Sequence, residues 1–100
     1  MELLDLTASS FDEVLANPRV LVYFWSEKCR PCRNVAPVIF ELAEEYEGLI
    51  TVANVNTEIE RDLLKRFNIM TVPTVILFEG GKESKRITGA QSKEEYQAEL

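Results

Sequence analysis

Two cysteines, Cys29 and Cys32, lie three positions apart in the segment EKCRPCR. Thiols at this spacing can bind a metal, form a structural disulfide or exchange electrons with other disulfides. A structural zinc site takes four Cys or His ligands, whereas the chain has two cysteines and no histidine. A zinc ion or an iron–sulfur cluster would have to be shared between two chains, and we expect no metal site.

A structural disulfide between these cysteines would close a loop of only about four residues. Closing so short a loop stabilises a protein by about 2 kcal/mol in the chain-entropy treatment, against about 3 kcal/mol or more for long loops. Strain in a tight bridge removes part of that. A chain of 100 residues buries enough apolar surface to fold without a staple. The spacing therefore favours redox exchange.

Redox exchange needs one exposed thiol that is partly ionised and a second thiol that resolves the mixed disulfide. Apolar residues recur three and four positions apart after the pair, and the pattern extends back to Cys32: Val35, Val38, Ile39, Leu42, Ala43 and Tyr46. This spacing predicts a helix with Cys32 on its buried face and Cys29 exposed at its start. Pro31 fits the first turn, and Pro37 predicts a kink within the helix.

The charges around the first cysteine favour its ionised form. Three cations and one acidic residue surround it: Lys28, Arg30, Arg33 and Glu27. A helix N-terminus stabilises a negative charge by about 0.3–1 kcal/mol, and by up to ~2 kcal/mol when partly buried. That corresponds to about one pKa unit at best. We therefore expect a lowered pKa for Cys29 and, through burial, a raised pKa for Cys32.

The rest of the chain predicts alternating strands and helices around this segment. Val20–Trp25 is a continuous apolar run, which is typical of a central strand buried on both faces. Further strands are predicted at Leu3–Thr7, Ile50–Asn56, Val75–Phe78 and Lys82–Thr88. Gly80-Gly81 joins the last two as a hairpin. The order is βαβαβαββα, which predicts an α/β fold with parallel strands first and an antiparallel hairpin last.

Three capping boxes mark the predicted starts of the remaining helices. They are Ser10 with Glu13, Thr57 with Glu60, and Ser92 with Glu95. Apolar residues follow each box at helical spacing: Phe11, Val14 and Leu15, then Ile59, Leu63 and Phe67, then Tyr96 and Leu100.

Composition and charge exclude several classes of function. The net charge of −6 disfavours a nucleic-acid partner, because phosphate contacts need a surplus of Lys and Arg. No apolar run approaches the ~18 residues of a membrane span, and the start MELLDLTASS lacks the pattern of a signal peptide. We expect one domain over residues 1–100, located in the reducing cytoplasm. We also expect a monomer, because no long apolar stripe is left unassigned.

Three segments carry a resemblance to the thioredoxin family. They are VLVYFWSEKCRPC (Val20–Cys32), NIMTVPTVILFEGG (Asn68–Gly81) and the ITGAQSKEE stretch around Gly89. The resemblance covers nearly the whole chain. It implies the thioredoxin fold, a central mixed sheet with helices on both faces. It also implies reduction of protein disulfides, with no bound cofactor and with electrons from an external reductase such as thioredoxin reductase.

The same resemblance assigns roles to individual residues. Cys29 resembles the attacking cysteine and Cys32 the resolving one, joined as a redox disulfide after each turnover. Pro73 matches the cis-proline that faces the cysteines, and the backbone of Val72 would pair with an extended substrate strand. The implied docking surface consists of Trp25, Pro31, Val72, Pro73, Gly89 and Ala90.

Four positions depart from the family pattern and make the chain atypical. Tyr23 stands where the family usually has a buried Asp, Lys28 where it has Trp, Arg30 where it has Gly, and Asn54 where it often has Lys. Tyrosine, with an ordinary pKa of about 10, is no base at neutral pH, so we expect slower release of substrate. By strand alternation Tyr23 lies near Cys32 and can offer it a hydrogen bond.

The added cations leave two other functions open. By stabilising a reduced thiolate, Lys28 and Arg30 predict a more oxidising pair, which suits an oxidising or glutathione-linked relative. A thioredoxin-fold binding module without turnover is the third possibility. The intact cysteine pair disfavours it, because an adaptor needs neither thiol.

Overall fold

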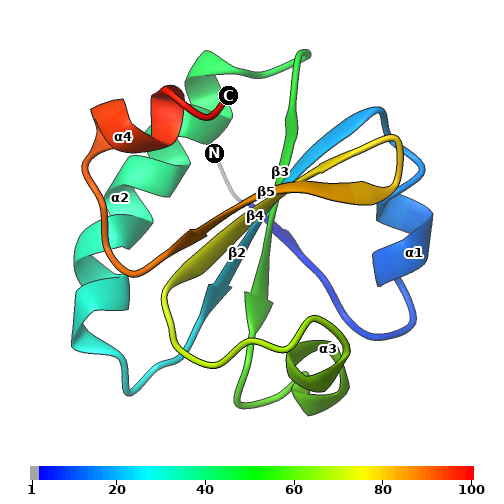
Figure 1. Ribbon diagram of the computed structural model, residues 1–100, viewed down its shortest axis with the longest axis vertical. Coiled ribbons are helices and arrows are strands. Elements are labelled where there is room, and N and C mark those ends of the chain that lie inside the picture. Colours follow the sequence, from blue (N-terminus) through cyan, green and yellow to red (C-terminus); the bar gives the residue numbers. More distant parts are fainter. Residues whose placement is uncertain (1–2) are drawn as a thin grey trace.

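The computed structural model describes residues 3–100, in which strands and helices alternate in the predicted order (Figure 1). The strands are β1 (Leu4–Asp5), β2 (Arg19–Trp25), β3 (Thr51–Asn56), β4 (Thr74–Glu79) and β5 (Lys82–Thr88). The helices are α1 (Phe11–Val14), α2 (Arg30–Glu45), α3 (Arg61–Arg66) and α4 (Lys93–Gln97). No helix within residues 3–100 has the length and apolar character that crossing a membrane requires.

The strands form one mixed sheet in the order β1-β3-β2-β4-β5. β3 pairs in parallel with β1 and β2, whereas β4 runs antiparallel to both β2 and β5. β2 therefore lies at the centre of the sheet, as its apolar sequence predicted, and five of its seven residues are buried. Helices α2 and α4 lie on one side of the sheet and α1 and α3 on the other (Figure 1).

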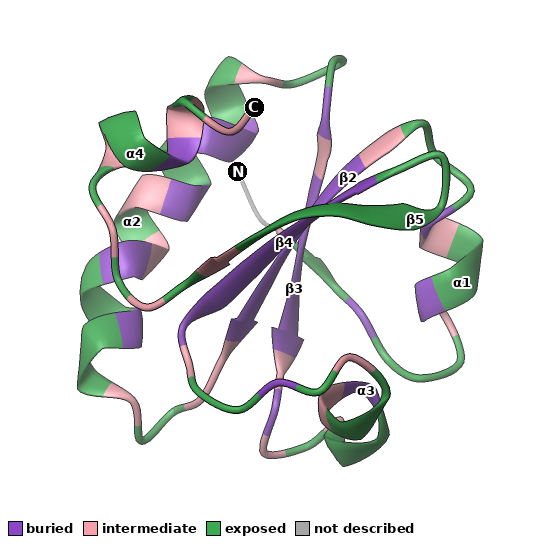
Figure 2. Ribbon diagram, viewed as in Figure 1, coloured by how far each residue is buried: buried purple, intermediate pink, exposed green. Residues whose placement is uncertain are grey.

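Figure 2 shows that β2 is buried along most of its length. Its successive side chains enter two separate cores. Val20, Val22 and Phe24 pack in the core that includes Phe11 and Leu63 of α1 and α3. The alternate residues pack in the other core, with α2 and α4: Leu21, Tyr23 and Trp25. This alternation places Tyr23 in the same core as Cys32, as predicted.

The long helix follows the predicted apolar pattern. Its buried face consists of Cys32, Val35, Ile39, Leu42 and Ala43. Cys29 is its N-cap, and Pro31 lies in the first turn, where the missing N–H leaves no helical carbonyl unpaired. Pro37 lies inside the helix, which continues beyond it to Glu45.

Two of the three capping boxes were wrong. The Ser10 hydroxyl accepts a hydrogen bond from the N–H of Thr7, and in the described residues it caps no helical N–H. The Thr57 hydroxyl donates to the carbonyl of Trp25, and α3 begins later, after Glu60. Ile59 therefore precedes the helix and is 72% exposed. In both cases a contact outside the helix occupies the hydroxyl that the motif assigned to capping.

The first strand is also shorter than Leu3–Thr7, because the chain turns directly after it. The carbonyl of Thr7 accepts hydrogen bonds from the N–H groups of Ser10 and Phe11, which begin α1. Pairing with β3 is therefore confined to Leu4 and Asp5.

The third capping box is confirmed and fixes α4 beside α2. The Ser92 hydroxyl accepts from the Glu95 N–H (3.2 Å), and the Glu95 carboxylate accepts from the Ser92 N–H (3.1 Å). Lys93 forms ion pairs with Glu41 and Glu45 of α2. Tyr96 is buried against the core between the two helices.

We predict that Ser92→Ala lowers the free energy of unfolding by about 1 kcal/mol, because the hydroxyl that caps the Glu95 N–H is lost. Urea unfolding measures the change. Ser9→Ala is the matched control, since the Ser9 hydroxyl contacts the Thr7 hydroxyl on the surface, and its effect should stay within about 0.5 kcal/mol. Equal effects of the two substitutions would contradict the capping assignment.

Candidate redox site

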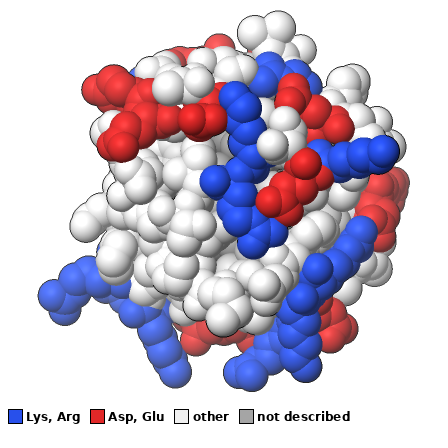
Figure 3. All heavy atoms as spheres, in the orientation of Figure 1, with Lys and Arg blue, Asp and Glu red and all other residues white. Residues whose placement is uncertain are grey.

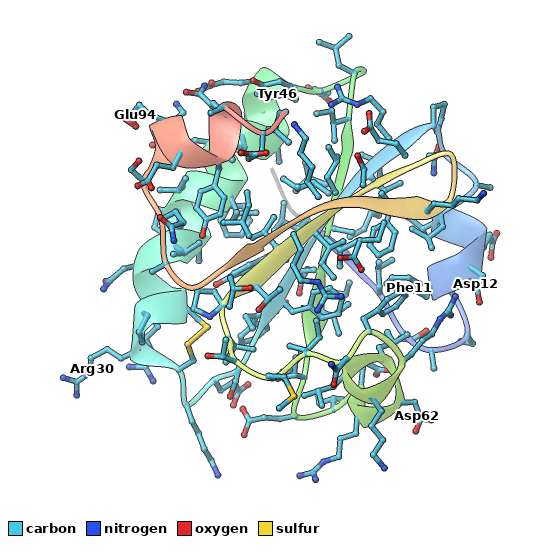
Figure 4. All side chains as sticks on the ribbon, viewed as in Figure 1. Phe11, Asp12, Arg30, Tyr46, Asp62 and Glu94 are labelled. Carbon is cyan, nitrogen blue, oxygen red and sulfur yellow. A yellow bond between two sulfur atoms is a disulfide. The ribbon has the colours of Figure 1, made fainter. Side chains whose placement is uncertain are left out.

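Cys29 and Cys32 form a disulfide where the chain leaves β2 and enters α2 (Figure 4). Cys29 has an extended backbone at the N-cap, with φ −88° and ψ 106°. The N–H of Cys32 donates to the Sγ of Cys29 over 3.1 Å. The same N–H and the positive end of the helix dipole would favour negative charge on the Cys29 sulfur once the disulfide is reduced.

The two sulfurs differ in their access to solvent. Cys32 is 2% exposed and packs in the core beneath α2, whereas Cys29 is half-buried at the surface. An incoming disulfide can therefore reach Cys29 first. This is the asymmetry that the apolar spacing predicted, while the separate pKa values of the two thiols stay predictions.

Two other segments meet the cysteines. The Val72–Pro73 peptide bond is cis, and the carbonyl oxygen of Val72 lies 3.5 Å from the Cys29 Sγ. The carbonyl of Pro73 in turn accepts from the Gly89 N–H over 2.8 Å. The Tyr96 hydroxyl donates to the carbonyl of Gly89 (3.3 Å), so α4 helps to fix this edge of the site.

The residues predicted to dock substrate differ in exposure. Trp25, Val72 and Gly89 are half-buried, Pro31 and Ala90 are exposed, and Pro73 is buried. Trp25 and Val72 pack against the core that also contains Cys32. Trp25 can therefore serve both in core packing and in docking, since it is partly buried against this core and partly exposed.

The Tyr23 hydroxyl donates to the carbonyl oxygen of Cys32 over 2.6 Å. The predicted hydrogen bond is thus present, with the backbone as acceptor. Burial raises the pKa of Tyr23 above its ordinary value, and the neighbouring Tyr96 adds to the shift. Tyr23 therefore stays a protonated donor that holds the first turn of α2.

A polar network behind Trp25 had not been predicted. The indole N–H of Trp25 donates to the Asn54 side-chain oxygen (2.8 Å). The Asn54 amide donates to the Asp5 carboxylate (2.8 Å) and to the Leu4 carbonyl (3.0 Å). Neighbouring strands thus fix the orientation of the indole. Nothing in the spacing of the sequence links Asn54 to Trp25.

Glu58 was not predicted as a residue of the site. Its carboxylate changes the predicted balance of charges around Cys29. One of its oxygens accepts from the Ser26 hydroxyl (3.0 Å) and from the Glu27 N–H (2.9 Å). The other lies 4.0 Å from the Lys28 ammonium. The bond from Ser26, followed by that from Glu27, lowers the pKa of Glu58. A second carboxylate therefore stands near Cys29, brought in by the loop after β3.

A surface pocket of about 430 Å³ opens beside the disulfide. Its walls are Tyr23, Trp25, Ser26, Glu27, Cys32, Arg33 and Ala36. The side chain of Cys32 thus borders space that water can enter, although little of it is exposed. Within residues 3–100, no group of three or more His, Cys, Asp or Glu side chains has the arrangement of a metal site.

The family model for thioredoxin matches residues 2–100. The chain belongs to the thioredoxin family. It is 41% identical over 96 residues to a thioredoxin of Alicyclobacillus acidocaldarius, across 95% of this chain and 91% of that protein. Thioredoxin 1 of a Nostoc strain is 42% identical over 90 residues, across 88% of this chain and 84% of that protein.

A third relative joins two activities in one chain. The bifunctional thioredoxin reductase/thioredoxin of Mycobacterium leprae is 44% identical over 87 residues, across 86% of this chain and 19% of that longer protein. With a redox-type cysteine pair in a thioredoxin-family chain, the protein is a thiol-disulfide oxidoreductase. The mixed sheet with helices on both faces is that family's fold.

The buried phenol of this thioredoxin predicts a loss of stability in alkali. Because the pKa of Tyr23 is raised in the fold, its contribution is complete below the ordinary value of about 10 and is lost as pH rises from there. The free energy of unfolding should therefore fall more steeply above about pH 10 in the wild type than in Tyr23→Phe. Urea unfolding at a series of pH values measures both slopes, and parallel curves would contradict the prediction.

Proposed function

We propose that this protein reduces the disulfides of other proteins through a cycle of Cys29 and Cys32. The observation that carries the proposal is the unequal exposure of the two cysteines at the start of α2. One sulfur is half-buried at the N-cap and the other is 2% exposed beneath it. A reductase needs such an inequality, because one thiol must meet the substrate and the other must wait for the intermediate.

In the first step the thiolate of Cys29 attacks one sulfur of the substrate disulfide. The substrate S–S bond breaks, a mixed disulfide forms, and the departing substrate thiolate takes a proton from water. The N–H of Cys32 and the dipole of α2 favour the ionised form of Cys29 before attack. Lys28 and Arg30 add positive charge from adjacent positions.

In the second step Cys32 loses its proton and attacks the Sγ of Cys29. The mixed disulfide breaks, the Cys29–Cys32 disulfide forms, and the second substrate sulfur leaves as a thiolate that takes a proton from water, so two electrons have passed to the substrate. Tyr23 is protonated and cannot take the proton of Cys32. Water in the neighbouring pocket must carry it, which supports the slower release expected from the missing carboxylate.

The substrate would dock along the segments that meet Cys29. Val72 offers its backbone to an extended strand beside the attacked cysteine, since its carbonyl lies 3.5 Å from the Cys29 Sγ. Pro73 shapes this loop through its cis bond. Trp25, Pro31, Gly89 and Ala90 would supply the flanking contact surface.

An external reductase would return the pair to its reduced form. The Mycobacterium leprae relative, whose name joins a thioredoxin reductase to a thioredoxin, supports a donor of that type. We place the protein in a reducing compartment such as the cytoplasm, as a single-domain monomer. There the dithiol state would be maintained between turnovers.

A more oxidising role is the second candidate. Lys28 is 90% exposed and Arg30 is exposed, so their charge faces any partner of the reduced thiolate. Stabilising the thiolate makes the disulfide a stronger oxidant. The carboxylate of Glu58 offsets part of this effect. The same cations would also suit a glutathione-linked relative. A binding module without turnover would need only the docking surface.

We predict that the wild type accelerates reduction of insulin disulfides by dithiothreitol. Cys29→Ser should abolish the acceleration, because no sulfur at the N-cap can attack. In the absence of dithiothreitol, reduced Cys32→Ser should stop after one mixed disulfide with insulin, which mass spectrometry detects as a trapped adduct. Turbidity of the released insulin chains reports the rate.

The two serine variants distinguish the candidate functions. Equal rates in the wild type and in Cys29→Ser would contradict reduction through this pair and favour a binding module. An oxidising enzyme would instead show its larger effect in forming disulfides in a reduced, unfolded substrate.

A further inference from the structure

Cations flank Cys29 in a chain that is acidic overall, with the carboxylates of Glu27 and Glu58 nearby. The net charge of the chain is −6, yet both residues adjacent to Cys29 in sequence are cations. The side chain of Lys28 is 90% exposed. Arg30 points away from the ribbon at the start of α2 (Figure 4). Figure 3 shows Lys and Arg side chains projecting there beside a broad area without charge.

These two cations contribute little to the fold. Some cations elsewhere pair closely with carboxylates, as in Arg66–Asp12 at 2.7 Å and Arg86–Glu83 at 2.8 Å, whereas others such as Lys65 and Lys82 form no ion pair among residues 3–100. Lys28 has one distant ion pair, 4.0 Å from Glu58. Arg30 has none among residues 3–100. An exposed ion pair contributes about 0–1 kcal/mol to stability. A carboxylate of a partner could therefore replace the present partner of Lys28 with little loss of stability.

We propose that Lys28 and Arg30 select partner proteins that carry an acidic residue beside the cysteine under attack. The inference rests on the proposed reduction of protein disulfides and names the class of substrate. A partner segment seated on Val72 would bring its cysteine to the Cys29 Sγ. Its next residues follow at about 3.3 Å each, so side chains one or two positions away lie within reach of both cations.

These charges would affect how often a partner segment meets the site and how the segment is oriented there. An acidic segment is repelled by the net negative charge of the molecule and attracted by the two cations beside Cys29. Exposed charges act over about 8–10 Å at ordinary ionic strength, so the preference should appear in kcat/KM and weaken as salt is added. A segment with Lys or Arg beside its cysteine meets like charge at the same place.

Internally quenched peptide disulfides provide the test, with aspartate, serine or lysine on either side of the attacked cysteine. The protein catalyses their reduction by dithiothreitol at low and high salt. We expect kcat/KM to be about tenfold higher for the aspartate peptide than for the lysine peptide at low salt. Using the ratio of two substrates removes any effect of the cations on the Cys29 thiol itself.

Charge reversal locates the preference. Lys28→Glu with Arg30→Glu should invert the ratio. Lys82→Glu with Lys85→Glu changes the net charge equally on β5 and should keep the wild-type ratio. A ratio of kcat/KM for the aspartate and lysine peptides that is near one in the wild type, or that salt does not lower, would overturn the inference. Turnover of the peptides in that case would still support the proposed function. Failure to reduce any of the peptides would overturn both.

Discussion

The hydrogen bond from the Cys32 N–H to the Sγ of Cys29 joins the fold to its chemistry. It exists only because Cys29 is the N-cap of α2 and takes an extended backbone conformation there. The sulfur then lies where the first helical N–H groups converge and where the helix dipole favours negative charge. The central strand, the long helix and the loop with Val72 all serve to hold this sulfur at that point.

The buried phenol of Tyr23 supports the start of α2 through the backbone. The phenol donates to the carbonyl of Cys32, so it stabilises the position of the resolving cysteine rather than its ionisation. On the outer side, Glu58 ties the Ser26–Glu27 loop and approaches Lys28. The site thus combines a rigid buried side with an outer side whose remaining charges are free to meet a partner.

The sequence predicted the features that depend on periodicity and on local motifs. The apolar steps after Cys32 defined the buried face of α2, and the apolar run of β2 placed it at the sheet centre. Side-chain hydrogen bonds across the fold could not be predicted in this way. Asn54 beneath Trp25 lies on a neighbouring strand, and its partner is chosen by register rather than by spacing. The hydroxyl of Thr57 likewise bonds to β2, which is why its capping box failed.

The pKa of the Cys29 thiol is the most direct measure of the N-cap arrangement. The rate of alkylation by iodoacetamide in Cys32→Ser, followed against pH, reports ionisation of that single thiol. A midpoint about one unit below the ordinary thiol value of about 8.5 is expected from the helix N-terminus and the adjacent cations. A midpoint at or above about 8.5 would mean that this end of α2 does not activate the sulfur.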